Sequence, residues 1–321
     1  MDEMATTIGL IMQGGCDPSD IANLLLALRD KGETVDEVAG AAQAMRSQMQ
    51  TIQSPQDDLL DTCGTGGDGS NTFNVSTAAA IVTAAAGVPV AKHGNRSFSS
   101  KTGSADVLAE LGVNVNANLE TVQRCLGQLG ICFCFAPLAH PAMKHVAAVR
   151  KELGVPTIFN ILGPLCNPAG APFQLLGVGR PALRGLLAAA LQKLGTRRAI
   201  VVCGEDGLDE VTLTGNTWVT EVGGPQLREL TWSPETFGLD VASTETMIVD
   251  GPAASATMVR HIFAGNPSPA RDIVVLNTAA ALWVVGTSES TIECARLAAE
   301  AIDSGRASEL LARLSELSHL E

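Results

Sequence analysis

The pattern of hydrophobic and polar positions divides the chain into a helical segment and a longer segment in which strands and helices alternate. Over residues 21–28, apolar side chains recur at the spacing of an amphipathic helix. Asp17 followed by Pro18 is a typical helix start, and Thr34 with Glu37 has the spacing of a capping box. We therefore expect packed helices at the beginning of the chain.

A polar linker at 50–58 precedes a change of texture to short apolar runs and Ala-rich helical stretches. The pattern predicts strands at 59–63, 88–91, 131–135, 174–178 and 199–203. It predicts helices at 76–86, 104–111, 141–153, 181–194 and 291–302, the last with Ser290 as a candidate N-cap. Such alternation is typical of an α/β fold with a mostly parallel sheet flanked by helices, in which ligands bind beyond the carboxyl ends of the strands.

Composition and charge narrow the class of protein. The net charge of −13 argues against nucleic acid as a partner, because a phosphate backbone requires clustered cations. No apolar run reaches the roughly 18 to 20 residues of a membrane span, and no signal peptide is recognisable at the start. The eight cysteines form no CxxC pair and no zinc-type cluster. We expect buried free thiols in a reducing cytoplasm.

The first stretch with candidate chemistry is the Gly-rich loop at 64–69, which follows a predicted strand and precedes a predicted helix. Its glycines allow the backbone to approach a phosphate closely, although an ordinary strand-to-helix turn would also explain them. Asn74, Ser76 and Thr77 open the next helix; they could bind phosphate or ribose, or could simply cap the helix. Ser76 could also ligate Mg²⁺.

The second stretch runs from Lys92 to Ser104 and combines cations, serines and glycines between two apolar elements. This composition favours an anion-binding loop over a solvated one. Its candidate anion-binding residues are Lys92, His93, Asn95, Arg96, Ser97, Ser99, Ser100, Lys101 and Ser104.

Three further groups are candidates. Asp209 and Glu210 follow a predicted strand and have the chemistry of Mg²⁺ ligands, but a solvated acidic turn is also possible. Arg150 could hold a carboxylate, or could be a surface charge like many helical arginines. His140 could equally be a hydrogen-bonded structural histidine. The turn-rich segment 159–168, with Gly163, either lines an apolar pocket or connects two elements.

Taken together, these motifs resemble the anthranilate phosphoribosyltransferases. The pieces are GTGGDG with NVST, KHGNR with SSKTGSADVLAELG, FAPLAHPAMKHVAAVRKELG, TIFNILGPLCNP and GEDGLDE, in family order along nearly the whole chain. The resemblance implies a small helical N-terminal domain at 1–53, completed by helices near 118–130 and 141–153. It also implies a larger α/β domain at 58–321, an active site between the two domains, and a homodimer.

The implied reaction joins anthranilate to 5-phosphoribosyl 1-pyrophosphate with release of pyrophosphate, in tryptophan biosynthesis. By resemblance, the donor-binding positions are Gly64, Gly67, Asp68, Thr72, Asn74, Ser76, Thr77, Lys92 and Ser104. Those for anthranilate are Gly64, His93, Asn95, His140, Arg150 and Gly163. The Mg²⁺ ligands would be Ser76, Asp209 and Glu210. No general base is assigned; Gly64, Lys92 and Mg²⁺ would stabilise the leaving group.

Two features depart from the family pattern. The family usually has another helix before the segment that corresponds to residues 6–14, and Pro156 stands where many relatives carry an arginine. Two alternatives are weighed beside the main interpretation. A pyrimidine nucleoside phosphorylase shares the Lys-His-Gly loop but has no need for the paired carboxylates. A non-catalytic, nucleic-acid-binding relative would conflict with the acidic charge.

Overall fold

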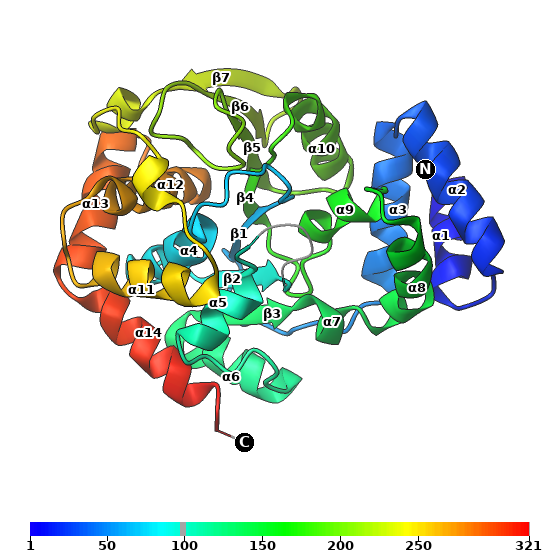
Figure 1. Ribbon diagram of the computed structural model, residues 1–321, viewed down its shortest axis with the longest axis horizontal. Helices are drawn as coiled ribbons and strands as arrows, with labels where there is room; N and C mark the ends of the chain where they lie inside the picture. The colour runs from blue at the N-terminus through cyan, green and yellow to red at the C-terminus, as the bar shows by residue number, and fades with distance from the viewer. Residues whose placement is uncertain (97–100, 321) are drawn as a thin grey trace.

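The computed structural model describes residues 1–96 and 101–320, which form a helical part followed by an α/β part (Figure 1). The helical part opens with α1 (Asp2–Met12), α2 (Pro18–Lys31) and α3 (Val35–Ser47). Asp17 precedes Pro18 at the start of α2, and Thr34 and Glu37 form the predicted capping box of α3. The first amphipathic segments are therefore helices, as their spacing predicts.

A seven-stranded sheet in the order β3-β2-β1-β4-β5-β6-β7 forms the centre of the α/β part. Its strands are β1 (Leu60–Gly64), β2 (Val90–Gly94), β3 (Ile131–Phe135), β4 (Phe173–Gly177), β5 (Arg198–Gly204), β6 (Thr217–Val222) and β7 (Arg228–Trp232). The strands β1 to β5 run parallel, which confirms the expected fold class. β6 and β7 extend the sheet antiparallel, a hairpin that the sequence pattern did not predict.

Helices cover both faces of this sheet (Figure 1). The helices that follow β1 along the chain are α4 (Val75–Ala85), α5 (Ser104–Glu110), α6 (Leu119–Leu129), α7 (Ala136–Ala139), α8 (Lys144–Leu153), α9 (Phe159–Leu162), α10 (Pro181–Lys193), α11 (Pro252–Phe263), α12 (Pro269–Val285), α13 (Thr291–Asp303) and α14 (Arg306–Leu317). Short 3₁₀ turns lie at Pro141–Met143, Gly163–Leu165, Pro234–Phe237 and Glu245–Met247.

The two faces of the sheet belong to two separate hydrophobic cores. Alternate residues of a strand point to opposite faces, so Val201 of β5 packs in the core shared with α1 to α3 and α10. Its neighbours Ile200 and Val202 pack in the other core, with α4 and α12. The core shared with α1 to α3 joins the helical part to the sheet, and it contains much of segment 158–166.

The two helices expected to complete the helical domain behave differently. α8 packs against α1 and α2, on the right of the view in Figure 1. α6 instead packs against β3 and α14, and its Cys125 and Leu126 are buried in the core of the α/β part. The expectation that the helix near 118–130 completes the helical domain is therefore wrong, since its apolar face lies against the sheet edge. The domain limits themselves stay a prediction.

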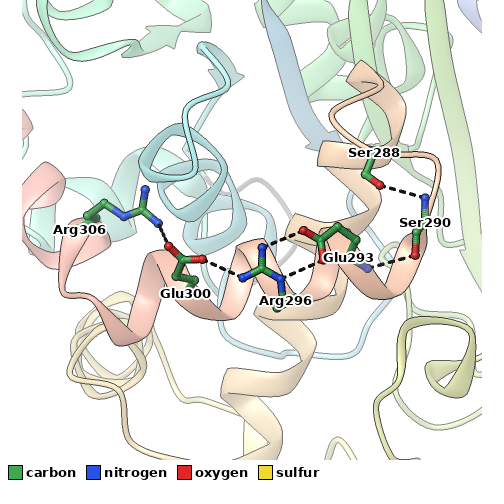
Figure 2. Close-up of polar contacts among 6 residues, drawn as sticks. All are labelled: Ser288, Ser290, Glu293, Arg296, Glu300 and Arg306. Carbon is green, nitrogen blue, oxygen red and sulfur yellow. Dashed lines mark hydrogen bonds and ion pairs between the residues drawn. The ribbon is translucent and has the colours of Figure 1, made fainter.

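Helix α13 shows how local polar contacts set an element start (Figure 2). Ser290 caps it as predicted, accepting from the Glu293 amide at 3.3 Å. Along its exposed side, Arg296 pairs with Glu293 and Glu300, and Arg306 of α14 also contacts Glu300.

Among the helices of the described residues, none combines the length and apolar character needed to cross a membrane.

Candidate active site

A cavity of about 340 Å³ lies at the carboxyl ends of the parallel strands, where the fold class predicts a ligand site. Its lining comes from the loop after β1, the end of β2, the start of α5, the loop after β5, and the segment around α9. The predicted residues in its wall are Gly64, Gly67, Asp68, Thr72, Asn74, Ser76, Lys92, His93, Asn95, Ser104, Arg150, Gly163, Asp209 and Glu210. The structure thus gathers most of the candidate residues around one space.

The loop after β1 has the backbone conformation that its glycines allow. Gly66, Gly67 and Gly69 have φ angles of 67°, 78° and 75°, in the region that side chains disfavour. Asn74 caps α4 by accepting from the Thr77 amide at 3.0 Å. The loop therefore ends at a helix N-terminus that faces the cavity, an arrangement suited to phosphate groups.

The two predicted loops are joined to each other. The side-chain amide of Asn74 donates to the Thr102 carbonyl at 3.0 Å, and the Thr102 hydroxyl donates to the Thr72 carbonyl at 3.1 Å. Ser104, the first residue of α5, donates to the Asn95 carbonyl at 3.3 Å. Because of these bonds, a ligand that contacts one loop lies within reach of the other. Ser97, Ser99 and Ser100 of the second loop lie outside the described residues.

The cations of the second loop occupy three different environments. Arg96 pairs with Asp106 at 2.8 Å, and Lys101 lies 3.6 Å from Asp250. Lys92 is buried, and its ammonium donates to the Thr62 carbonyl at 2.6 Å and to the Ser76 hydroxyl at 3.2 Å. Burial lowers the pKa of Lys92, while nearby carboxylates oppose that shift. Lys92 therefore places a cation beside the proposed Mg²⁺ ligand at the floor of the cavity.

The carboxylates of the 204–210 turn come close to the first loop because two glycines leave room for them. The Asp209 carboxylate accepts from the Gly66 amide at 2.9 Å. Gly64 and Gly177 are paired opposite each other on β1 and β4, and a Cβ on either one would collide with Asp209. Because neither glycine has a side chain, the acidic turn can pack directly over the ends of β1 and β4.

This acidic group has the charge pattern of a cation site. Burial, followed by the charge of Asp68, raises the pKa of Asp209 to about 7. Burial and the Asp209 charge raise the pKa of Glu210 well above its usual range. Within the described part of the chain, no three His, Cys, Asp or Glu side chains form a closed metal cluster. Mg²⁺ prefers such an open set, because it binds one or two carboxylates and takes its other oxygens from phosphates and water.

Another part of the cavity wall comes from α8 and the segment around α9, and it includes Arg150. The Arg150 guanidinium lies 5.7 Å from the centre of the Phe159 ring. Arg150 pairs with no carboxylate of residues 1–96 or 101–320, and burial lowers its pKa. Gly163 and Pro164 complete the wall beside it. A planar anion could therefore place its carboxylate on Arg150 and its ring along the wall.

His93 lines the same cavity and is held by two hydrogen bonds. Its amide donates to the buried Asp61 carboxylate at 3.0 Å, and its Nδ1 lies 3.1 Å from the Gly163 carbonyl oxygen. Burial and the neighbouring His140 lower the pKa of His93 to about 3, so the ring is neutral. A carbonyl only accepts, so Nδ1 carries the proton and Nε2 keeps a free lone pair.

Two predicted residues lie behind the cavity wall and do not line it. His140 is buried with its ring centre 5.1 Å from that of His93, and its Nε2 donates to the Cys166 carbonyl at 3.0 Å. Thr77 is fully buried in α4. His140 is therefore placed to act on ligands through His93, and both assignments to direct binding stay predictions.

Sequence reasoning missed the residues that support the wall. They are Asp61, which accepts from the His93 amide, and Arg46 and Gln174, which bind the 163–166 turn from other elements. A carboxylate at 61 inside an apolar strand was the one available signal, because a buried Asp requires a partner.

The comparisons with known proteins agree with this geometry. The family described as "Glycosyl transferase family, helical bundle domain" matches residues 1–49, and "Glycosyl transferase family, a/b domain" matches residues 56–308. The anthranilate phosphoribosyltransferase of Rhodopirellula baltica is 50% identical over 98% of this chain and 92% of its own length. That of Rhodospirillum rubrum is 52% identical over 95% of this chain and 87% of its own.

The chain belongs to the anthranilate phosphoribosyltransferase family. The crystal structure of the Thermus thermophilus family member has a TM-score of 0.94 at 43% identity and covers 99% of this chain and 95% of its own. The family member from Saccharomyces cerevisiae, solved in complex with PRPP and Mg, has a TM-score of 0.89 at 29% identity, with coverages of 99% and 93%. The family, enzyme class and fold class predicted from sequence are thereby confirmed, and neither alternative function is favoured.

Proposed function

We propose that this cavity transfers the 5-phosphoribosyl group from 5-phosphoribosyl 1-pyrophosphate to the amine of anthranilate, with release of pyrophosphate. The observation that carries the proposal is that two chemically different groups of residues line one cavity. One group combines a glycine loop, a helix N-terminus and half-buried carboxylates, and the other combines Arg150 with the wall at Phe159, Gly163 and Pro164. The alternative phosphorylase reaction gives no use for the acidic group.

The donor lies along the two joined loops in this proposal. The backbone amides at 67–69 face the pyrophosphate, and Asn74, Ser76 and Ser104 offer side-chain hydrogen bonds to the phosphates and ribose of the donor. Lys92 brings positive charge to the same side, which offsets the negative charge that builds on the leaving group. The described residues thus stabilise pyrophosphate as it departs.

The residues also suit Mg²⁺, which would be held by Ser76, Asp209 and Glu210. Their raised carboxyl pKa values mean that the negative charges are poorly compensated by the protein alone, as expected for a site that receives a cation. When bound, the ion would neutralise charge on the pyrophosphate. The yeast relative in complex with PRPP and Mg supports this part of the proposal.

The acceptor lies against the second group of residues. Arg150 orients the anthranilate carboxylate, and the wall at Gly163 and Pro164 holds the ring flat. An arylamine is neutral at pH 7, so its lone pair can attack without prior removal of a proton. Catalysis then rests mainly on positioning and on the electrostatics of the leaving group. The yeast relative in complex with 4-fluoroanthranilate supports the use of this acceptor class.

We further propose a homodimer in the cytoplasm that serves tryptophan biosynthesis and binds neither nucleic acid nor membranes. Free cysteines throughout the described chain and the net charge of −13 support this setting. Size-exclusion chromatography with light scattering tests the dimer, and a monomer at micromolar concentration would contradict it.

The reaction itself is tested by anthranilate fluorescence. Protein, Mg²⁺, anthranilate and 5-phosphoribosyl 1-pyrophosphate are mixed, and fluorescence should fall as pyrophosphate appears. A chelator should stop the reaction, whereas phosphorolysis of a pyrimidine nucleoside should be absent with or without metal. Steady fluorescence with intact donor and Mg²⁺ would refute the proposal, and chelator-resistant phosphorolysis would favour the phosphorylase.

A further inference from the structure

The short turn at residues 163–166 is bound by side chains in an unusual way. Each of its four successive carbonyl oxygens accepts a hydrogen bond from a side chain of a different element. The donors, in order from Gly163 to Cys166, are His93 Nδ1 at 3.1 Å, Gln174 Nε2 at 2.6 Å, Arg46 Nε at 2.7 Å and His140 Nε2 at 3.0 Å. β2, β4, α3 and the end of α7 therefore all meet on one turn.

Burial of polar side chains such as Gln174 and Arg46 costs free energy, so their presence behind this turn calls for a physical explanation. Gln174 is buried, and it lies opposite Asp61 in the register of β4 and β1. Arg46 is half-buried, burial lowers its pKa, and no carboxylate of the described residues forms an ion pair with it. A buried charge without a counter-ion is normally avoided. Here the guanidinium donates a hydrogen bond to one backbone carbonyl, that of Leu165.

The turn carries two groups that the acceptor would meet. Gly163 and Pro164 form part of the cavity wall, and the Gly163 carbonyl sets the tautomer of His93. With its proton on Nδ1, His93 keeps a buried Nε2 lone pair that no protein atom of the described residues satisfies. If the turn moved, the cavity wall would shift with it. The Gly163 carbonyl would then no longer hold the His93 proton on Nδ1.

We propose that Gln174 and Arg46 are positioning residues of the acceptor site: by holding the Pro164 and Leu165 carbonyls, they fix the wall at Gly163 and Pro164 and the Nδ1-protonated state of His93. This inference rests on the proposed function for its kinetic consequence. Arg46 belongs to α3 of the helical part, whereas Gln174 belongs to the sheet. The turn is therefore clamped between the two parts of the molecule.

The kinetic test uses Gln174→Met and Arg46→Met, in which a methyl group takes the position of the donor Nε2 or Nε and the donor is removed. Loss of one such hydrogen bond predicts a roughly five- to tenfold rise in the anthranilate KM, with the donor KM within about twofold of wild type. Arg46→Lys retains a donor and should recover most of the loss. Equal changes in both KM values, or a lower melting temperature with both KM values unchanged, would overturn the proposal.

Arg124→Met is the matched control, because the half-buried Arg124 of α6 also donates to a backbone carbonyl, that of Leu320, at 2.6 Å. It lies outside the cavity wall and should leave both KM values unchanged. A rise in the anthranilate KM of this variant equal to that of Arg46→Met would overturn the proposal.

A second readout needs no substrate. ¹⁵N NMR of the imidazole nitrogens of His93, assigned with a His93→Asn variant, should show protonated Nδ1 in wild type and a mixture of tautomers in Gln174→Met. Protonated Nε2 in wild type would overturn the inference. If the wild-type protein fails to consume anthranilate but shows the expected tautomer, the proposed function fails and the clamped turn stands.

Discussion

Replacing Gly177 by alanine should displace the acidic turn. Gly177 does not itself line the cavity, so every lining residue keeps its identity. Gly177 ends β4, opposite Gly64 of β1. A Cβ at 177 would lie 2.5 Å from the Asp209 carbonyl carbon and closer still to its oxygen, and both are backbone atoms that cannot rotate away. The backbone φ of Gly177 lies outside the left-handed region, so the effect of the substitution comes from packing alone.

The size of the effect follows from this geometry. Carbon atoms in contact lie about 3.5 Å apart, and the Cβ would lie even nearer to the Asp209 carbonyl oxygen than to its carbon, so residue 209 must retreat by more than about 1 Å. A displacement of that size in a positioned group costs on the order of 10²-fold in rate. Overpacking of this kind also destabilises a fold by about 1–3 kcal/mol. Gly177→Ala should thus remain folded, with a lower kcat/KM and a higher Mg²⁺ requirement.

The assay is initial rate by anthranilate fluorescence across a Mg²⁺ titration, with the melting temperature measured in parallel. Gly185→Ala is the matched control, because a Cβ there would meet no atom within 4 Å. In the exposed face of α10 it should be neutral or stabilise by about 0.5–1 kcal/mol. Wild-type activity and Mg²⁺ dependence in Gly177→Ala would refute the argument that this glycine admits the acidic turn.

Three other outcomes follow from the same structure. Arg150→Ala should raise the anthranilate KM far more than the donor KM in steady-state kinetics, and equal rises would contradict its role. The pKa of Asp209 is raised from 3.8 to about 7, so the folded protein keeps a proton that the unfolded chain loses between those values. In denaturant titrations of the metal-free protein, the free energy of unfolding should therefore fall as pH rises from about 4 to 7. Asp209→Asn should flatten this pH dependence, and an unchanged slope in the variant would contradict the prediction. Ser290→Ala should cost about 1 kcal/mol of stability as a lost helix cap, whereas Arg296→Ala, in the exposed ion pairs of Figure 2, should leave the melting temperature unchanged.

The sequence predicted those parts of the fold that have local signals. The capping box at Thr34 and the cap at Ser290 specify helix starts by their own side chains, and both are confirmed. The pattern did not predict α12, since this helix is buried on nearly all sides and has no polar face to give a period. It also missed the hairpin of β6 and β7, which pairs at the sheet edge after a long irregular turn.

The candidate site divides in the same way. Residues whose side-chain charge itself indicates ligand binding, such as Lys92 and Asp209, were predicted and do line the cavity. Arg46 and Gln174 act on backbone carbonyls, and a carbonyl is the same in every residue. The bond from Arg46 reaches across 119 positions of the chain, so no spacing in the sequence could indicate it.

Glycines that look alike in the sequence do different work in the structure. Gly66, Gly67 and Gly69 have positive φ and nothing near an added Cβ, so they shape the backbone of the phosphate loop. Gly64 and Gly177 lie in ordinary strand conformation and are required because Asp209 occupies the space a side chain would fill. A substitution in the first group should therefore alter donor binding through loop shape, whereas one in the second group should alter it through the carboxylates. Mg²⁺ dependence separates Gly67 and Gly69 from Gly64 and Gly177, because only the latter pair changes the distance between the acidic turn and the strand ends; Gly66 shares both roles, since its amide donates to Asp209.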